Sequence, residues 1–217
     1  DELMLTTARQ NLKKSKLGIH VITGFATISR DLSKALDLGV DVVRVASHCT
    51  EADITQRHIS YVRERGKEVY GVLMMSHMAS KETLADEAMK MESYGAEGII
   101  LMDSAGAYLP NDVADKVELL VKKLTIPIGF HAHNNLGLSV ANSIVAVQSG
   151  ATILDGTIKG FGAGAGNTPL EVLVAVLDKM GYYVGIDLYK ILDAADWAEK
   201  ELLQTIPSIK PTSLVSG

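Results

Sequence analysis

Two histidines lie two positions apart near the middle of the sequence, in the segment Gly129–Asn135 (GFHAHNN). The apolar, β-rich run from Ile126 to Phe130 predicts a short buried strand that leads into them. Residues i and i+2 of a strand point to the same face, so His131 and His133 would present their imidazoles together at the strand end. Two such nitrogens suit one divalent metal ion. The alternative is a pair of hydrogen-bonded histidines in a polar turn.

Oxygen ligands are expected to complete the shell of a hard divalent ion. Asp103 and Asp155 are the carboxylates near predicted strand ends, and Asp155 is placed to face the interior. Asp103 is equally suited to forming a turn before Gly106. The amide oxygen of Asn167 is a further candidate, for contact with the metal or with one of its protein ligands. Its alternative role is to cap the helix that follows.

The glycine-rich segment Gly160–Asn167 (GFGAGAGN) first suggests a phosphate-binding loop. It has no Gly-Lys-Ser/Thr ending and does not match G-x-G-x-x-G, so a nucleotide site is rejected. Alternating Gly and Ala instead allow the backbone to pass close to a substrate or metal site. Directly afterwards, Thr168 and Glu171 have the spacing of a capping box, with Pro169 at the first helical position.

Other polar residues have less specific patterns. Arg44 lies within a predicted strand, where a charge is costly unless paired, so it is expected to bind an anionic carboxylate or a structural acid. His48 and Cys49 suggest a nucleophile pair, but neighbours on an extended segment point apart. His77 is expected to line the pocket.

These residues are positioned by a regular alternation of six strands and helices, each unit roughly the size of a parallel βαβ repeat. Polar groups follow five neighbouring strands at their C-terminal ends, as on the catalytic face of a (β/α) barrel. An open doubly wound sheet would gather them at one switch point. The predicted strands are Gly18–Thr23, Val40–Ala46, Val69–Met74, Gly98–Met102, Ile126–Phe130 and Ile153–Ile158.

The predicted fold is therefore a TIM (β/α)8 barrel truncated to about six βα units, strands 3 to 8. A full barrel needs eight strands, and a helix is already predicted from Glu2, so the first two strands are expected to be missing at the N-terminus. Residues 1–185 are expected to form the partial barrel catalytic domain. Residues 186–217 are expected to begin a C-terminal helical region, with an irregular tail from Pro207.

Composition narrows the function. The 217 residues carry a net charge of −5 and no basic stripe, so nucleic acid is not an expected partner. Cys49 is the lone cysteine, which excludes a disulfide framework and favours the cytoplasm. No apolar run reaches membrane-spanning length and no signal peptide opens the sequence, so no membrane partner is expected.

The histidine segment Phe130–Gly137 (FHAHNNLG) resembles the metal-binding motif of a family of aldolases, acyl-CoA lyases and synthases related to hydroxymethylglutaryl-CoA lyase. Asn135 and a glycine loop without cysteine depart from the synthases and lyases. The similarity to the 4-hydroxy-2-oxo acid aldolases of this family covers essentially the whole chain. It rests on four further segments: Val45–Asp53, Leu73–Met78, Asp103–Ala107 and Gly162–Asn167.

The resemblance implies a divalent ion, Mn2+ or another such as Mg2+ or Co2+, bound by His131 and His133. It implies substrate contacts from Ser104 and His131. It also implies an aspartate ligand, a catalytic arginine and a histidine base on a first strand, and a tyrosine from the C-terminal region. None of these four has a counterpart here, so the catalytic residues themselves stay unknown.

The implied activity is a class II aldolase cleavage of 4-hydroxy-2-oxopentanoate to pyruvate and acetaldehyde, through a metal-stabilised enolate of pyruvate. The alternatives are a Claisen-type acyl-CoA lyase or synthase of the same family, and a non-catalytic barrel fragment acting as a partner subunit. The resemblance also implies a small 2-keto acid substrate, an acylating acetaldehyde dehydrogenase as partner, and a place in the catabolism of aromatic hydrocarbons.

Overall fold

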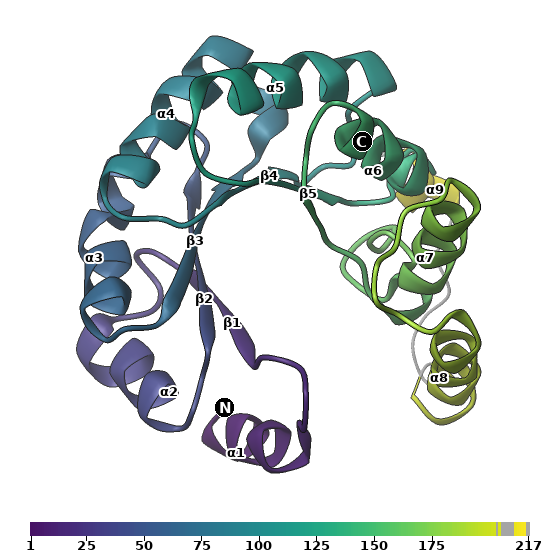
Figure 1. The fold of residues 1–217 in the computed structure, drawn as a ribbon, viewed down its shortest axis with the longest axis horizontal. Coiled ribbons are helices and arrows are strands. Elements are labelled where there is room, and N and C mark those ends of the chain that lie inside the picture. The colour runs from purple at the N-terminus through teal and green to yellow at the C-terminus, as the bar shows by residue number, and fades with distance from the viewer. Residues whose placement is uncertain (203, 205–210, 216–217) are drawn as a thin grey trace. The chain divides into compact units, whose positions relative to one another are not determined.

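The computed structural model describes residues 1–202, 204 and 211–215 (Figure 1). Along the described chain, strands and helices alternate from the helix at Glu2–Asn11 to the helix at Leu170–Lys179, as predicted, and two further helices follow. In order they are α1 (Glu2–Asn11), β1 (Gly18–Ile22), α2 (Ser33–Asp37), β2 (Val42–His48), α3 (Gln56–Glu64), β3 (Glu68–Met74), α4 (Lys81–Ser93), β4 (Ile99–Asp103), α5 (Pro110–Lys123), β5 (Ile128–Ala132), α6 (Ser139–Gln148), β6 (Ile153–Leu154), α7 (Leu170–Lys179), α8 (Leu188–Glu201) and α9 (Pro211–Leu214).

The six described strands form one sheet in strict sequence order, β1-β2-β3-β4-β5-β6. The pairings from β1 to β4 and from β5 to β6 are parallel. A doubly wound sheet reverses its strand order at a switch point, and this sheet does not. The order is that of consecutive βα units of a barrel, so the predicted fold class of six such units is confirmed.

Several predicted boundaries were wrong. The fifth strand begins at Ile128, because Pro127 has no N–H and its carbonyl accepts the N–H of Ile99. The sixth strand ends at Leu154 instead of running to Ile158. In the described part of the predicted irregular tail, Pro211–Leu214 is helical. The rest of that tail lies outside the described residues.

The chain divides into two compact units, and the first comprises Asp1–Leu101 with Leu119–Ile128. In Figure 1, helices α2, α3 and α4 lie on one side of strands β1 to β3. The strand residues facing this side, such as Val43 and Val45, are fully buried. Burial alternates over the first four residues of β2, as the two-residue period of a strand predicts, and Ala46 and Ser47 are then also buried. The predicted split at residue 185 is not tested by this division and remains a prediction.

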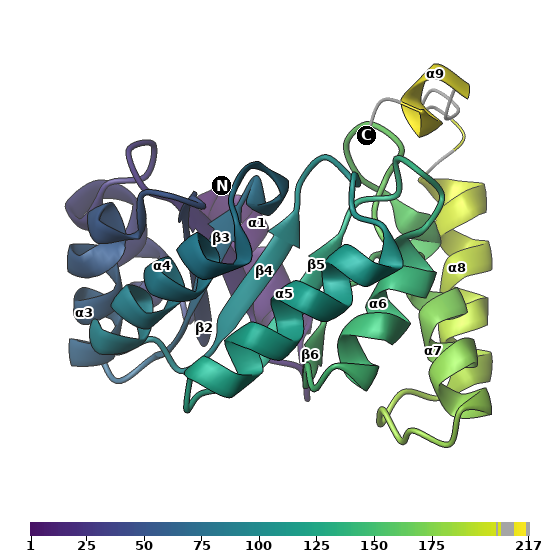
Figure 2. The ribbon, with the colours of Figure 1, turned by 90° about the horizontal axis from the view of Figure 1, so that it is seen from above.

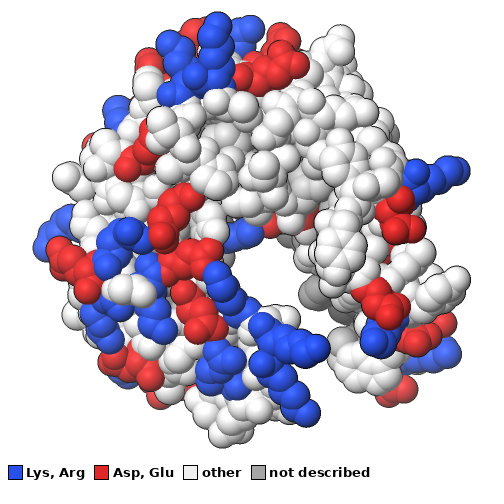
Figure 3. All heavy atoms as spheres, in the orientation of Figure 1, with Lys and Arg blue, Asp and Glu red and all other residues white. Residues whose placement is uncertain are grey.

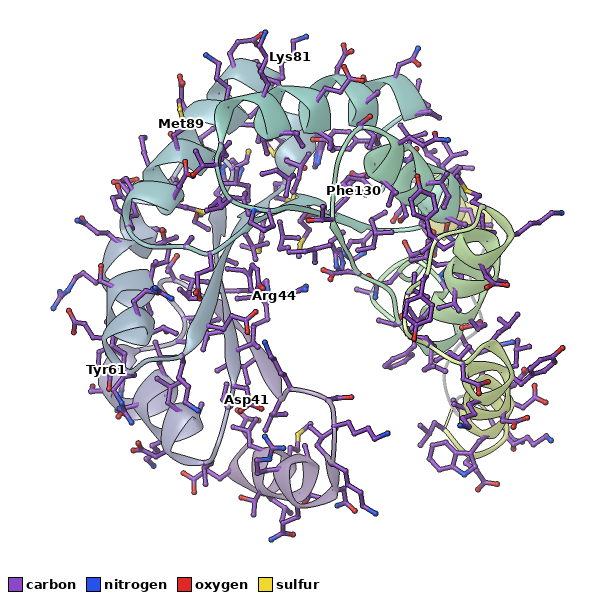
Figure 4. All side chains as sticks on the ribbon, in the orientation of Figure 1. Asp41, Arg44, Tyr61, Lys81, Met89 and Phe130 are labelled. Atoms are coloured by element: carbon purple, nitrogen blue, oxygen red, sulfur yellow. The ribbon has the colours of Figure 1, made fainter. Side chains whose placement is uncertain are left out.

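The other face of these strands carries a polar row. His20, Arg44 and Tyr70 are in register on three neighbouring strands, and Figure 4 shows Arg44 turned away from the helices. The Tyr70 hydroxyl donates to Glu68, which also binds Lys16. Burial and then Glu68 raise the pKa of Tyr70 to about 12. Figure 3 shows acidic and basic side chains interleaved over this unit.

The second unit comprises Met102–Glu118 and the described residues from Gly129 onward. Strands β5 and β6 pair in register Gly129↔Ile153 and Phe130↔Leu154. Helix α7 packs against α6 and α8 (Figure 2). An apolar cavity of about 560 Å3 between α6, β6 and α7 is lined by Leu154, Leu173 and other apolar residues, and it contains none of the predicted site residues.

Candidate metal-binding active site

The two histidines lie side by side in the second unit. Their ring centroids are 5.2 Å apart, with an interplanar angle of 55°. His131 is on β5, and His133 follows the strand, where it forms an isolated antiparallel bridge with Asn167. The juxtaposition of the imidazoles expected from the two-residue spacing is therefore present.

Asp155 orients the ring of His131. Its Oδ2 atom lies 3.0 Å from Nδ1 of His131, and both side chains are largely buried. The contact follows from the sheet register, because Phe130 is paired with Leu154 and the next residues along both strands come together. A carboxylate on Nδ1 leaves Nε2 as the nitrogen available to a metal. The sequence alone suggests Asp155 as a direct oxygen ligand and does not predict this pairing with His131.

Asn167 faces the other nitrogen of His131. Its Oδ1 lies 3.1 Å from Nε2, while its Nδ2 donates to the carbonyl of Phe161 at 2.9 Å. The second bond fixes the amide orientation, so the oxygen is the atom that meets His131. Gly162 makes room for this amide, since a Cβ there would lie 2.0 Å from Nδ2. The alternative role of Asn167 as a helix cap is not observed, because Pro169 holds the cap position of α7.

His133 has an environment that favours its neutral form. Burial, with a smaller contribution from the neighbouring charge of His131, lowers the pKa of His133 below its usual 6.5, against a hydrogen bond to the Ala163 backbone. A neutral imidazole has a free lone pair at one ring nitrogen, and this is the form that binds metal. The electrostatics at His133 are therefore compatible with a metal ligand.

Asp103 forms the turn that carries Ser104. Its buried carboxylate accepts the backbone N–H groups of Ala107 and Tyr108 at 3.0 and 3.1 Å. Of the two predicted roles for Asp103, the structure supports the turn. The Asp103 carbonyl also accepts the N–H of His133 at 3.3 Å, which joins the Ser104 turn to the histidine segment.

Gly106 makes this close approach possible. Its φ is +62°, a conformation that favours glycine. A Cβ at this position would lie 2.6 Å from the backbone nitrogen of Asn135. The turn and the histidine segment can therefore lie together only with glycine at position 106.

The side chains around His131 and His133 determine which ions could bind there. No group of three His, Cys, Asp or Glu side chains that could hold a metal was found among the described residues. The nitrogens of His131 and His133 with the amide oxygen of Asn167 give a mixed nitrogen and oxygen set that suits Mn2+, Mg2+ or Co2+ in part. The chemistry of these three side chains fits part of the shell of such an ion.

Other residues singled out in the sequence belong to the first unit. Cys49 is fully buried and donates to the Met75 carbonyl at 3.3 Å, although its sulfur also lies 3.9 Å from Nδ1 of His48. Nδ1 of His48 is itself 2.9 Å from the Thr50 hydroxyl. The expectation that the two side chains point apart was therefore wrong, although the buried thiol is directed at a carbonyl and not exposed to a substrate. The expected binding of Arg44 to an anionic carboxylate or a structural acid and the expected place of His77 in the pocket stay predictions.

The capping box predicted at the start of α7 was wrong. The Thr168 hydroxyl contacts the Ala132 carbonyl and the Ser143 hydroxyl, both at 3.4 Å, instead of a helix N–H. The Glu171 carboxylate accepts the N–H of Lys159 at 3.0 Å. Thr168 and Glu171 therefore contact neighbouring segments and do not cap α7. The helix has no side-chain cap.

Comparison with known proteins gives a consistent result. The model of the HMGL-like family matches residues 5–197. The chain is 65% identical over its full length to the 4-hydroxy-2-oxovalerate aldolase of Pectobacterium atrosepticum, and 61% identical to that of Spirochaeta aurantia. It spans 63% and 64% of the lengths of these curated relatives.

A solved structure supports the fold. The hydroxymethylglutaryl-CoA lyase of Bacillus subtilis aligns with a TM-score of 0.80 at 22% identity, over 91% of this chain and 74% of the lyase. At this identity the likeness concerns the fold alone.

Proposed function

This chain belongs to the HMGL-like family, and on that premise we propose that it carries the metal- and substrate-binding part of a divalent-metal-dependent aldolase active site. The proposed substrate is 4-hydroxy-2-oxopentanoate. A base takes the 4-hydroxyl proton and the C3–C4 bond breaks. Acetaldehyde leaves, and the bonding electrons pass to the enolate of pyruvate, which takes a proton at C3.

One observation carries this proposal: His131 and His133 lie with ring centroids 5.2 Å apart, and His131 is oriented by Asp155 with its other ring nitrogen facing Oδ1 of Asn167. Nε2 of His131, a ring nitrogen of His133 and Oδ1 of Asn167 would hold the ion. A bound divalent ion would supply Lewis acidity toward the oxygens of a 2-keto acid. Manganese is the proposed ion, with magnesium or cobalt as substitutes.

Two further side chains of this chain orient the metal ligand and contact the substrate. Asp155 keeps the His131 ring in one orientation and one tautomer, with the proton on Nδ1. Ser104, on the turn ordered by Asp103, contacts the substrate together with His131. No residue of this chain is assigned as the base.

An aldolase is preferred over a Claisen-type acyl-CoA lyase or synthase. The proteins that are similar over the whole of this chain are named as aldolases. The loop Gly160–Asn167 also has no cysteine. Assays with 4-hydroxy-2-oxopentanoate and with an acyl-CoA substrate separate the two, by release of pyruvate or of coenzyme A. A protein that binds metal but turns over neither substrate would support the partner-subunit alternative.

The metal assignment is tested by elemental analysis of the natural protein that carries this sequence, compared with its His133→Ala variant. We expect the variant to lose most of its manganese. His20→Ala, which removes an exposed histidine on β1, is the matched control and should keep it. Equal metal content in wild type and His133→Ala would contradict the proposal.

A partner and a location follow from the same proposal. Acetaldehyde is reactive, so an acylating acetaldehyde dehydrogenase is proposed to receive it directly, within the catabolism of aromatic hydrocarbons. Co-purification of the two proteins tests this, and independent migration at micromolar concentration would oppose it. Cys49 is the one cysteine of the sequence, so it forms no disulfide within the chain, and we propose a cytoplasmic location on that ground. No helix in the described part of the chain is long and apolar enough to span a membrane.

A further inference from the structure

Lys159 has an unusual backbone conformation directly before the glycine-rich loop. Its φ is 57° and its ψ is 18°, the left-handed region, inside the short turn Ile158–Gly160. Among the described non-glycine residues, only Met75 also has a positive φ. Side chains with a Cβ disfavour this region, so the surrounding structure must stabilise it.

Two carboxylates engage this one lysine. Glu171, on α7, accepts the backbone N–H of Lys159 at 3.0 Å and is only 8% exposed. Glu199, on α8, lies 2.9 Å from Nζ of Lys159 and its side chain is 61% exposed. The first contact holds the backbone from a buried position, whereas the second holds only a side chain in water. A charge-assisted bond from a buried carboxylate is the stronger of the two.

The two residues after Lys159 supply the acceptors that orient Asn167. The Gly160 carbonyl accepts the backbone N–H of Asn167 at 2.8 Å. The Phe161 carbonyl accepts Nδ2 of Asn167 at 2.9 Å. The directions of both carbonyls depend on the backbone turn at Lys159. The other polar atom of the Asn167 side-chain amide, Oδ1, is the one that faces Nε2 of His131.

We propose that Glu171 is a positioning residue that holds Lys159 in its left-handed conformation and so keeps the Asn167 amide oxygen beside His131. The carboxylate acts on the loop, through Lys159, and not on the N-terminus of its own helix. The effect on loop geometry stands by itself. The effect on metal affinity rests on the proposed function.

The loop effect is tested without metal, by amide hydrogen exchange. In Glu171→Ala, hydrogen exchange at the backbone N–H of Asn167 should accelerate by about tenfold. This is the effect of losing one charge-assisted hydrogen bond. Glu199→Ala is the matched control, because it removes the other carboxylate from the same lysine, and exchange should stay within about twofold of wild type. Unchanged exchange in Glu171→Ala, or equal acceleration in both variants, would overturn the proposal.

A second pair of variants avoids the loss of a buried carboxylate, which could itself impair folding. Lys159→Gly and Lys159→Val both keep the N–H and both lose the ion pair to Glu199. Only valine disfavours the left-handed conformation. Exchange at Asn167 should therefore accelerate in Lys159→Val and not in Lys159→Gly. Similar exchange in the two variants would contradict the role assigned to this backbone conformation.

The consequence for the site is measured by Co2+ titration, followed by visible absorption. Glu171→Ala should bind Co2+ about tenfold more weakly than wild type. Glu171→Gln, which keeps an oxygen acceptor for Lys159, should recover most of the affinity. Equal affinity in wild type and Glu171→Ala would overturn the positioning role. Wild type that binds no Co2+ would instead contradict the proposed metal site, and the exchange data would still decide the role of Glu171.

Discussion

The carboxylate of Asp155 accepts a hydrogen bond from Nδ1 of His131 at 3.0 Å, across the neighbouring strands β5 and β6. The side chains are 12% and 17% exposed, so water competes little for this bond. A carboxylate in this position fixes the imidazole ring and makes its free nitrogen a better ligand. The pair thus links the sheet register to the chemistry of the candidate site.

Removal of this carboxylate should weaken metal binding. In Asp155→Ala the His131 ring loses its orienting partner, and affinity for Mn2+ or Co2+ should fall by roughly 10- to 100-fold. Calorimetric titration measures the change. Asp178→Ala, which removes an exposed carboxylate from α7, is the control and should bind as wild type does. Unchanged affinity in Asp155→Ala would show that the pair does not support a metal ligand.

A side chain at position 162 should disturb Asn167. The Cβ of Gly162→Ala would lie 2.0 Å from Nδ2 of Asn167, so the amide must leave its bond to the Phe161 carbonyl. We expect about tenfold weaker metal binding, as for loss of an orienting contact. Ala163→Ser adds one atom to an exposed position of the same loop and serves as the control. Equal titration curves for wild type and Gly162→Ala would count against a role for Asn167.

His133 should make the folded state less stable in mild acid. Its folded pKa is lowered from 6.5 by burial first and by His131 second. Between 6.5 and the lower folded value, the unfolded chain therefore binds more protons, and the free energy of unfolding falls as the pH decreases. Urea unfolding at about pH 7 and pH 5 should show a smaller decrease for His133→Gln than for wild type. The same decrease in both proteins would exclude His133 as its source.

Tyr70 should lose its proton at a higher pH than an exposed tyrosine does. Burial and the hydrogen bond to Glu68 raise its pKa to about 12, so the folded protein keeps this proton after an unfolded tyrosine has lost its own near 10. The free energy of unfolding should therefore fall as the pH rises from 10 to about 12. Ultraviolet titration of phenolate should show a component near 12. That component should be missing in Tyr70→Phe and retained in Tyr183→Phe, which alters an exposed tyrosine. Its persistence in Tyr70→Phe would refute the assignment.

The strands were predictable because each is a compact apolar run bounded by turn residues, and those signals are local. The side-by-side histidines were predictable for the same reason, since two-residue spacing on a strand determines their relative direction. The partner of His131 was not. Asp155 is 24 positions away, and only the register of β5 against β6 brings the two together. If Gly129 is aligned with Ile153 on the neighbouring strand, then His131 falls opposite Asp155, two residues further along each segment.

Glu171 shows the limit of a motif. Its spacing from Thr168 is that of a capping box, but each side chain has a second possible partner in the folded chain. The left-handed conformation of Lys159 places an N–H within reach of Glu171, and nothing in the sequence indicates a positive φ at a lysine. Tertiary contacts therefore decided the partners of Thr168 and Glu171. The sequence does not decide whether Asp103 is a metal ligand or forms a turn, because an aspartate at a strand end suits both roles.

The strict strand order also has a consequence for how the chain folds. The parallel pairings described between β1 and β4 and between β5 and β6 join residues fewer than thirty positions apart, from Gly18 with Val42 to Gly129 with Ile153. Closing loops of this length costs less chain entropy than joining distant segments, and low contact order favours rapid folding. Each new βα unit can add to the edge left by the unit before it. Within the described pairings, each strand can therefore find its partner soon after the ribosome releases it.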